Sequence, residues 1–193
     1  MYQELKQHLK KFITISENDF NLFINKAKLV QLDKNEPWVL EGRISQSFGF
    51  VNSGLLRHFY IDNGNEKTEK FYTSQSWLGD YPSFLSNTPS LRNYVAIEKS
   101  ELLVLSFNDL QKFYATVPSI EKFGRLYAEQ LIIESYNRNR SFLLDSAEKK
   151  YTKFINEYPE LTQKIPQYLI AQYLGVKPET LSRIRKKFLD IGQ

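Results

Sequence analysis

The spacing of apolar residues divides the chain into three stretches. From residue 2 to residue 29, apolar side chains such as Leu5 and Leu9 recur every three or four positions, which predicts helix. Ser16 followed by Asp19 indicates a helix start within this stretch, because a serine oxygen caps the first turn and an acidic side chain suits the third position. The chain is therefore expected to begin with a helical segment.

From about residue 30 to residue 107, short runs of aromatic and β-branched residues alternate with turn residues. This texture predicts several short strands, as in a β-barrel or β-sandwich. The clearest turn is Asp62–Asn65, in which Asn63 and Gly64 tolerate the positive φ angles of a type I′ turn, so the flanking strands should pair antiparallel. The expected strands are Trp38–Leu40, Ser47–Val51, Leu55–Ile61, Lys70–Thr73, Tyr94–Ile97 and Leu102–Leu105.

After Pro118 the pattern returns to helix and stays helical to the C-terminus. Ile120, Phe123 and Tyr127 form one apolar stripe, and a second apolar face opens at Ile132. A helix that is apolar on two sides has to be covered on two sides. We expect the β domain to cover one face and a second copy of the same helix to cover the other; burial within a single chain is the alternative.

The composition is that of a folded chain with a small excess of positive charge. Of its 193 residues, 41% are hydrophobic and 25% are charged, and the formal net charge is +4. The basic excess points weakly to a polyanionic partner. No apolar run is long enough to span a bilayer, and residues 1–11 mix charged and polar groups, unlike a secretory signal. A cytoplasmic location with no membrane partner is expected.

The residue types that carry most enzyme chemistry are scarce. The chain has no cysteine, which excludes disulfides, thiolate zinc sites and iron–sulfur clusters. Its two histidines, His8 and His58, lie far apart, a poor basis for a metal site or a catalytic triad. There is no glycine-rich phosphate loop. We expect neither a metal site nor an enzymatic activity.

The strongest local pattern lies between Gln167 and Lys187. Ala171 is small where two helices would cross, Gly175 falls at a tight turn that needs a left-handed backbone, and Pro178 can start a second helix. This is the pattern of a helix-turn-helix. The positions expected to form the core shared by its two helices are Ile170, Leu174, Val176, Leu181 and Ile184.

The second helix of this pattern carries polar residues suited to DNA. Arg183 can bond guanine in bidentate fashion, and Glu179 can accept a hydrogen bond from a cytosine amino group. The basic residues that follow suit phosphates. The alternative is a structural or protein-binding module whose basic run is merely solvated. The expected DNA-binding residues are Gln167, Lys177, Glu179, Thr180, Ser182, Arg183, Arg185, Lys186 and Lys187.

In the order of these features the chain resembles the Crp/Fnr family of bacterial transcription regulators, and most closely its Bacteroidetes-like branch. The resemblance rests on Gly54–Ile61, Ser100–Leu105, Pro166–Val176 and Glu179–Lys186. It implies an α+β fold with an N-terminal jelly-roll barrel of the cyclic-nucleotide-binding type, a long dimerisation helix and a C-terminal winged-helix-like helix-turn-helix domain. It also implies that Glu179 and Arg183 read bases.

The resemblance is weaker at the effector site. Family members that bind cyclic AMP carry Gly-Glu, and about a dozen residues later Arg-Ser or Arg-Thr. Here the first pair is Gly79-Asp80, Ser90 falls where the arginine is expected, and Arg92 comes two residues late, about 7 Å further along a strand. We therefore expect that cyclic AMP does not bind and assign no cofactor; a two-residue adjustment of the loop, which would restore Arg92 to the phosphate site, is one alternative. The residues expected at the ligand site are Gly79, Asp80, Ser90 and Arg92; a different pocket lined by Trp77, Tyr81, Phe84 and Tyr94, or a purely structural site, is the alternative.

The sequence thus predicts a homodimeric, sequence-specific DNA-binding regulator with an altered effector pocket. Its partners would be a two-fold symmetric double-stranded operator, with an unidentified small-molecule effector and RNA polymerase as further candidates. A ligand-binding or protein-interaction module that has lost DNA binding is the alternative. The expected domains are a sensor over 1–117, a dimerisation helix over 118–145 and a DNA-binding domain over 146–193.

Overall fold

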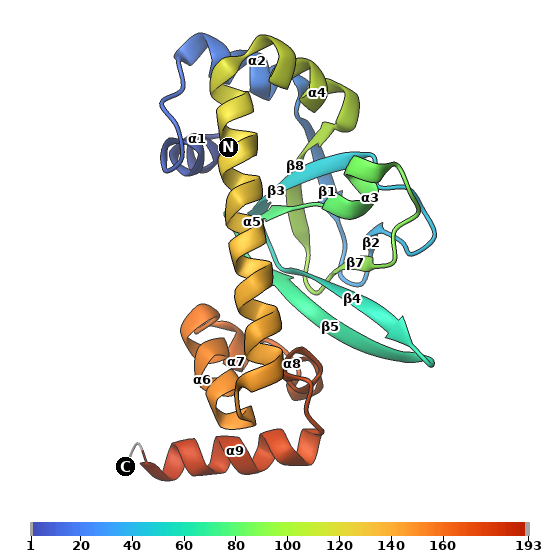
Figure 1. The fold of residues 1–193 in the computed structure, drawn as a ribbon, viewed down its shortest axis with the longest axis vertical. Helices are drawn as coiled ribbons and strands as arrows, with labels where there is room; N and C mark the ends of the chain where they lie inside the picture. The colour runs from blue at the N-terminus through green and yellow to red at the C-terminus, as the bar shows by residue number, and fades with distance from the viewer. Residues whose placement is uncertain (1, 192–193) are drawn as a thin grey trace. The chain divides into compact units, whose positions relative to one another are not determined.

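The computed structural model describes residues 2–191. These residues form two compact units, one made of residues 2–59 with 71–131 and the other of residues 60–70 with 132–191 (Figure 1). The domain boundaries expected from the sequence remain predictions. Within the described part of the chain, no helix combines the length and apolar character that crossing a membrane requires.

Eight strands form two four-stranded sheets rather than one closed barrel. The recorded strand pairs are antiparallel. One sheet has the order β1-β8-β3-β6, formed by Lys28–Leu32, Ser100–Ser106, Ser47–Ser53 and Trp77–Leu78. The other has the order β2-β7-β4-β5, formed by Pro37–Val39, Asn93–Ala96, Leu56–Asp62 and Asn65–Tyr72. The expected barrel is therefore corrected to an open two-sheet jelly roll.

The two sheets share one apolar core to which all eight strands contribute. Residues one position apart in a strand point to opposite faces, so each strand sends alternate side chains inward. The largest fully buried side chain in this core is Tyr94, which is 1% exposed. The buried members are Leu32, Val39, Val51, Leu56, Tyr72, Leu78, Tyr94, Ala96 and Leu102.

The turn between β4 and β5 confirms the predicted hairpin. Asn63 has a φ angle of 49° and Gly64 one of 77°, so both central residues are left-handed, as a type I′ turn requires. This turn matches the right-handed twist of the paired strands.

The N-terminal helical prediction is correct for its first part and wrong at its end. The segment forms two helices, α1 (Gln3–Lys10) and α2 (Glu17–Lys26). The predicted cap is confirmed, because the Ser16 side chain accepts a hydrogen bond of 3.0 Å from the Asp19 amide. The helix does not continue to Leu29, since β1 begins at Lys28 and pairs with β8. Tertiary pairing overrides the local helical pattern here.

Two further helices were not predicted: α3 (Tyr81–Ser86) and α4 (Phe107–Thr116). The start of α4 does carry a sequence signal. Ser106 accepts a hydrogen bond of 3.1 Å from the Asp109 amide, the same serine–aspartate spacing that caps α2. That signal could have ended the predicted strand region at residue 106.

A second apolar core joins helices α1, α2 and α4 and the start of the long helix α5 (Pro118–Leu144) to the first sheet. Trp77 lies at its centre. Its ring stacks on Phe48 at 5.0 Å with an interplanar angle of 3° and lies 5.1 Å from Phe123 of α5. The Trp77 carbonyl accepts a hydrogen bond from the Tyr127 hydroxyl at 3.2 Å. This packing covers the stripe of α5 predicted to face the β domain.

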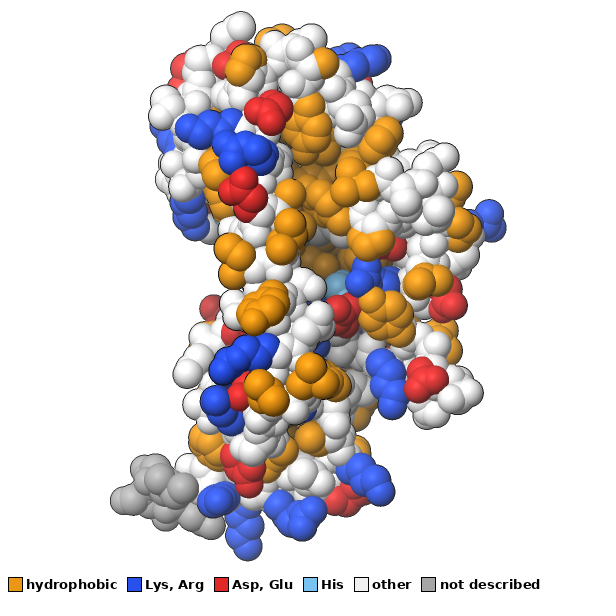
Figure 2. All heavy atoms as spheres, in the orientation of Figure 1, with side chains coloured by type: hydrophobic (Ala, Val, Ile, Leu, Met, Phe, Trp, Pro, Cys, Tyr) orange, Lys and Arg blue, Asp and Glu red, His pale blue; other side chains and the backbone are white. Residues whose placement is uncertain are grey.

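The other apolar face of α5 is not covered by any of the residues that the structure describes. Ile132 is 69% exposed, Ile133 61% and Tyr136 68%. Figure 2 shows apolar side chains exposed along this helix. The alternative that one chain buries both faces of the helix is therefore wrong.

The second unit contains α6 (Ala147–Glu157), α7 (Leu161–Lys164), α8 (Gln167–Leu174) and α9 (Pro178–Ile191). The expected winged-helix character is not found, since residues 132–191 contain no strand. A one-turn helix, α7, connects α6 to α8, and this connection contains Pro159 and Pro166. Proline has no backbone N–H to give to a strand ladder, so paired strands are disfavoured there.

His8 should make folding sensitive to acid. Its ring lies against Phe50 and Trp77 at 5.6 and 6.2 Å, and its Nδ1 atom is buried without a hydrogen-bond partner. Burial, helped by nearby Lys11, lowers the imidazole pKa from 6.5 to about 4. Above pH 6.5 the ring is neutral in both states. As the pH falls from 6.5 to 4, only the unfolded chain gains this proton, and the free energy of unfolding should fall by about 2 to 3 kcal/mol.

This expectation is checked by urea unfolding between pH 4 and pH 8, with His8→Phe as the comparison. The variant keeps an aromatic ring at this buried position and removes the titrating group. Its free energy of unfolding should therefore fall less as the pH is lowered from 8 to 4. An identical pH dependence in both proteins would contradict the assignment.

Candidate nucleic-acid interface and effector site

Helices α8 and α9 are joined by a three-residue turn whose geometry requires glycine. Gly175 ends α8 in the left-handed conformation, with a φ of 67°. The amide of Val176 donates to the Ala171 carbonyl at 3.0 Å, which closes the end of α8. A Cβ atom at position 175 would lie 2.7 Å from the Phe142 ring, so a side chain there would strain the backbone and would also displace that ring.

The predicted core between α8 and α9 is present. Ala171, Leu174 and Leu181 are each no more than 2% exposed, and Ile184 is also buried. Val176, predicted to join them, is only half-buried. These contacts fix the inner face of α9 against α8 and leave its opposite face to solvent.

The exposed face of α9 carries most of the predicted DNA-contacting residues. Glu179, Arg183 and Lys186 follow one another at helical spacing and are all exposed. The Arg183 guanidinium lies 3.4 Å from the Thr180 hydroxyl, a long contact that leaves it accessible. Basic side chains gather over α9 in Figure 2. Among the described residues no acidic group forms an ion pair with Arg183, Lys186 or Lys187.

The remaining predicted DNA-contacting residues lie around this face. Gln167 and Lys177 are exposed at the start of α8 and in the turn, Ser182 is exposed on α9, and Thr180 and Arg185 are half-buried. The structure therefore brings all nine predicted residues onto α8, the turn and α9.

Side chains of α5 and α6 contact α8 at Tyr173. The Arg138 guanidinium lies 4.4 Å from the centre of the Tyr173 ring. The Tyr173 hydroxyl donates a hydrogen bond of 3.2 Å to the Glu157 carboxylate. Burial raises the pKa of Tyr173 to about 12, so the hydroxyl keeps its proton and the hydrogen bond persists across neutral pH. Sequence reasoning missed these three residues, because they are joined only by the tertiary fold.

Three of the four residues predicted to bind an effector, Asp80, Ser90 and Arg92, bind one another. Asp80 is 1% exposed, and its carboxylate pairs with the Arg92 guanidinium at 3.1 Å. The Ser90 hydroxyl accepts a hydrogen bond from the Arg92 amide at 2.9 Å and donates one to the Arg92 carbonyl at 2.8 Å. The Gly79 carbonyl accepts from the Tyr94 hydroxyl at 3.2 Å. The arginine charge in this site is therefore matched by a buried carboxylate of the chain itself.

The alternative aromatic pocket is not formed by the residues proposed for it. Trp77, Tyr81 and Phe84 pack in the core beneath the helices, whereas Tyr94 packs in the core between the sheets. Around Tyr94 the neighbours are His58, at a ring distance of 5.0 Å, and Trp38, at 6.0 Å. The ring of Tyr94, whose hydroxyl donates to the Gly79 carbonyl, is thus packed against other aromatic side chains.

Part of the chain matches a known family at the level of sequence. Residues 29–117, which include all eight strands except the first residue of β1, match the family model of the cyclic nucleotide-binding domain. These residues form a domain of that type. No curated protein matches the chain in sequence.

Solved structures share the fold over most of the chain. The c-di-GMP responsive global regulator CLP of Xanthomonas campestris is 12% identical, with a TM-score of 0.73 over 92% of this chain and 93% of its own. FixK2 from Bradyrhizobium japonicum is 17% identical, with a TM-score of 0.70 over 86% of both chains. The catabolite activator protein of Thermus thermophilus is 21% identical, with a TM-score of 0.58 over 96% of this chain and 88% of its own. These likenesses show that the chain shares the fold of the three solved proteins.

The contributions of Asp80 and Arg92 to the free energy of unfolding should be strongly coupled to each other. Removing Arg92 as Arg92→Met leaves a buried carboxylate without its partner, which should lower the free energy of unfolding by about 3 to 5 kcal/mol. Adding Asp80→Asn to that variant should recover much of the loss, because the neutral amide no longer needs a cation. Urea unfolding of the two single variants and the double variant gives the coupling energy directly.

The matched control is the exposed pair formed by Arg125 and Glu129, whose side chains are 53% and 54% exposed. Its coupling energy should be about 0.5 kcal/mol or less. Equal coupling in the two pairs would show that Asp80 and Arg92 are a surface contact rather than a structural one.

Proposed function

We propose that this chain is a sequence-specific DNA-binding transcription regulator of the Crp/Fnr type. The observation that carries the proposal is the exposed, basic face of α9, held by the buried contacts to α8 and by the glycine turn. A helix supported in this way and free on its outer face is the element that enters the major groove in helix-turn-helix proteins. The domain matched in residues 29–117 and the regulators of similar fold support the same proposal.

Base reading is assigned to the first half of α9. Arg183 would donate two hydrogen bonds to guanine, and Glu179 would accept one from cytosine, while Thr180 and Ser182 lie beside them. The cations Lys177, Lys186 and Lys187 would contact phosphates, which position the helix without reading sequence.

The exposed face of α5 is the proposed dimer interface. Ile132, Ile133 and Tyr136 form an apolar face that a second copy of α5 would cover. Two copies related by a two-fold axis would place two α9 helices in successive major grooves, about 34 Å apart, on a two-fold symmetric operator.

The β domain is proposed as an altered effector site. The Asp80–Arg92 pair supports this assignment, because the arginine that would hold a cyclic phosphate is already neutralised. We therefore propose that cyclic AMP does not act on this chain and that any small-molecule effector is of another class. An effector can shift the chain between two states only through a difference in its affinity for them.

The proposal is tested by selecting genomic fragments with the purified protein and sequencing those retained. The wild type should enrich a two-fold symmetric site. Arg183→Ala should lower affinity for that site about 10- to 100-fold, because a bidentate arginine–guanine contact is lost, and should relax sequence preference at one position of each half-site.

Lys187→Ala is the matched control on the same helix. It should weaken binding to enriched and unrelated fragments alike and reduce the salt dependence by about one ion. No enrichment by the wild type, with or without cell-extract metabolites, would overturn the proposal in favour of a module that has lost DNA binding.

A further inference from the structure

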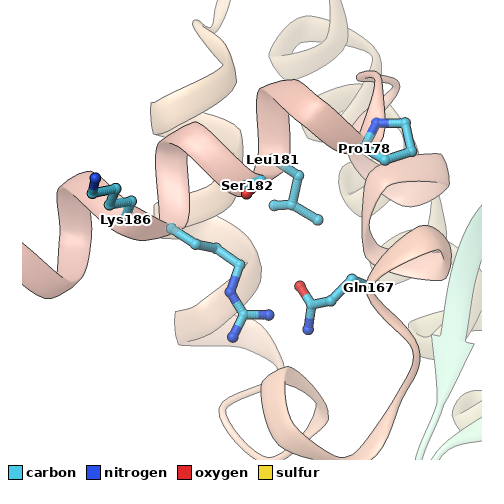
Figure 3. Close-up of a pocket in the computed structure, with 6 residues that line it drawn as sticks. Gln167, Pro178, Leu181, Ser182 and Lys186 are labelled. Carbon is cyan, nitrogen blue, oxygen red and sulfur yellow. The ribbon is translucent and has the colours of Figure 1, made fainter.

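The pocket between α8 and α9 lies within the surface already proposed to contact DNA. Its volume is about 320 Å³, and Figure 3 shows the Gln167 amide pointing into it below Leu181. The exposed face of α5 is a separate surface. It carries polar side chains that a purely apolar dimer interface does not explain.

The exposed face of α5 is apolar on both sides of one polar turn. Ile132 and Tyr136 are exposed before this turn, and Leu143, which is 84% exposed, follows it. The turn itself contains Asn139 and Arg140, which are also exposed. An amide and a cation on consecutive residues thus interrupt the apolar face between Ile132 and Leu143.

The spacing of this face is that of a two-stranded coiled coil. The residues along the seam, the line on which two such helices touch, recur at alternate steps of three and four. One series with these steps is Ile132, Tyr136, Asn139 and Leu143. A second series shares Tyr136 and Leu143 but passes through Arg140. In either series one of the two polar residues lies in the seam and the other lies beside it, and the partner that this spacing fits is a second α5.

Polar side chains on the opposite side of α5 have partners within the chain. The Arg138 guanidinium lies 4.4 Å from the centre of an aromatic ring of α8. The Ser141 hydroxyl donates a hydrogen bond of 2.6 Å to the Asp145 carboxylate. By contrast, Asn139 and Arg140 form neither a hydrogen bond nor an ion pair with any residue that the structure describes. Their donors and acceptors remain available to a second copy.

Two copies of α5 that pair in parallel and in register would satisfy these groups, because like residues then lie at the same level. The Asn139 side-chain oxygen of one copy would accept from the Arg140 guanidinium of the other, and two-fold symmetry repeats the contact. The Tyr136 ring, one helical turn away, would offer its face to the same cation. The two arginine heads would reach solvent at the edges of the seam along their aliphatic stems, which keeps their charges apart.

Other alignments satisfy the two polar residues less well. A slip of one heptad would set them against the aliphatic side chains of Ile132 and Ile133, which cannot accept a hydrogen bond. An antiparallel alignment can turn Arg140 towards Glu129, but that carboxylate already pairs with Arg125 at 2.7 Å. A polar residue in a coiled-coil seam selects one alignment in this way, at a cost in stability.

We propose that Asn139 and Arg140 form a polar layer across the dimer interface and that this layer holds two copies of α5 parallel and in register. The inference rests on the proposed function, from which it takes the dimer. It adds the two residues that select the alignment, and a parallel alignment places both α9 helices at the same end of the dimer. The apolar residues supply the affinity of the interface, and the polar layer supplies its specificity.

The alignment is measured with a single introduced cysteine, because the chain has none of its own. Leu143→Cys places a thiol at a position common to both series. In the proposed alignment the two thiols face each other, with a Cα separation of roughly 4.4 to 6.8 Å, so mild oxidation should link most chains in pairs. A slip of one heptad would separate them by about 10 Å along the helix, and antiparallel pairing of Arg140 with Glu129 by about 25 Å, and neither separation allows the bond.

The polar layer is tested by replacing both of its residues, Asn139→Leu with Arg140→Leu, in this cysteine background. The dimer should bind about tenfold more tightly, because no charge has to leave water. The linked fraction should nevertheless fall at least about twofold, as slipped alignments and larger oligomers appear in sedimentation equilibrium. Arg140→Lys keeps a cation in the layer and should retain the linking seen before substitution.

The matched control, Ser135→Leu with Asn137→Leu, adds two leucines to the same helix at positions outside both series. It should leave both the linked fraction and the oligomeric state unchanged. All the substituted residues are exposed in the single chain, so thermal unfolding should show no loss of melting temperature in any variant.

The two proposals fail in different ways, because linking and sedimentation need no DNA. A chain that links through Leu143→Cys but enriches no DNA overturns the proposed function and supports the layer. A chain that sediments as a monomer, or that pairs without linking through this cysteine, overturns the layer. A double leucine variant that stays strictly dimeric with an unchanged linked fraction also overturns it, whatever the outcome with DNA.

Discussion

A side chain at position 175 would be strained, and the geometry of the C-terminal unit depends on the glycine found there. Gly175 takes a left-handed backbone that other residues adopt at a cost, and the Phe142 ring occupies the place of its Cβ atom. The turn sends α9 back across α8, so that Leu181 and Ile184 reach the buried side of α8. Burying these residues leaves the opposite side of α9, with Glu179 and Arg183, open to solvent. The proposed reading face is thus a consequence of the turn.

The arginines of the two predicted sites differ in how their charges are satisfied. Arg92 pairs with a carboxylate that is almost fully buried. The Ser90 hydroxyl bonds both the backbone amide and the backbone carbonyl of Arg92. Arg183 has only a long contact to Thr180 among the described residues. A charge that is already paired gains little from a ligand, whereas an unpaired donor gains a full charge-assisted bond. This contrast supports the proposal that the chain binds DNA and not a cyclic phosphate.

Local chemistry made part of this structure predictable. The Asn63-Gly64 turn, the Ser16 cap and the Gly175 turn each depend on a few neighbouring residues, and all three form as expected. The α8–α9 core follows from helical spacing in the same way. The residues proposed to contact DNA could be placed on α8, the turn and α9 because one short motif contains them all.

Features set by distant partners were not predictable. Residues 28 and 29 continue a helical pattern, yet they join a strand because β8 lies beside them. Asp80 and Arg92 lie far enough apart in sequence that only the fold of α3 and β7 brings them into contact. Whether eight strands close into a barrel or form two sheets depends on pairings that periodicity does not record.

Dimethyl sulfate protection of the bound operator tests most directly whether α9 reads DNA. The reagent methylates the N7 atom of guanine, which lies in the major groove where Arg183 would bind. The account predicts two protected guanines or guanine clusters about 10 base pairs apart, one for each α9 of a dimer. Retention of the fragment without any N7 protection would contradict it, because the chain would then hold DNA through the phosphates alone.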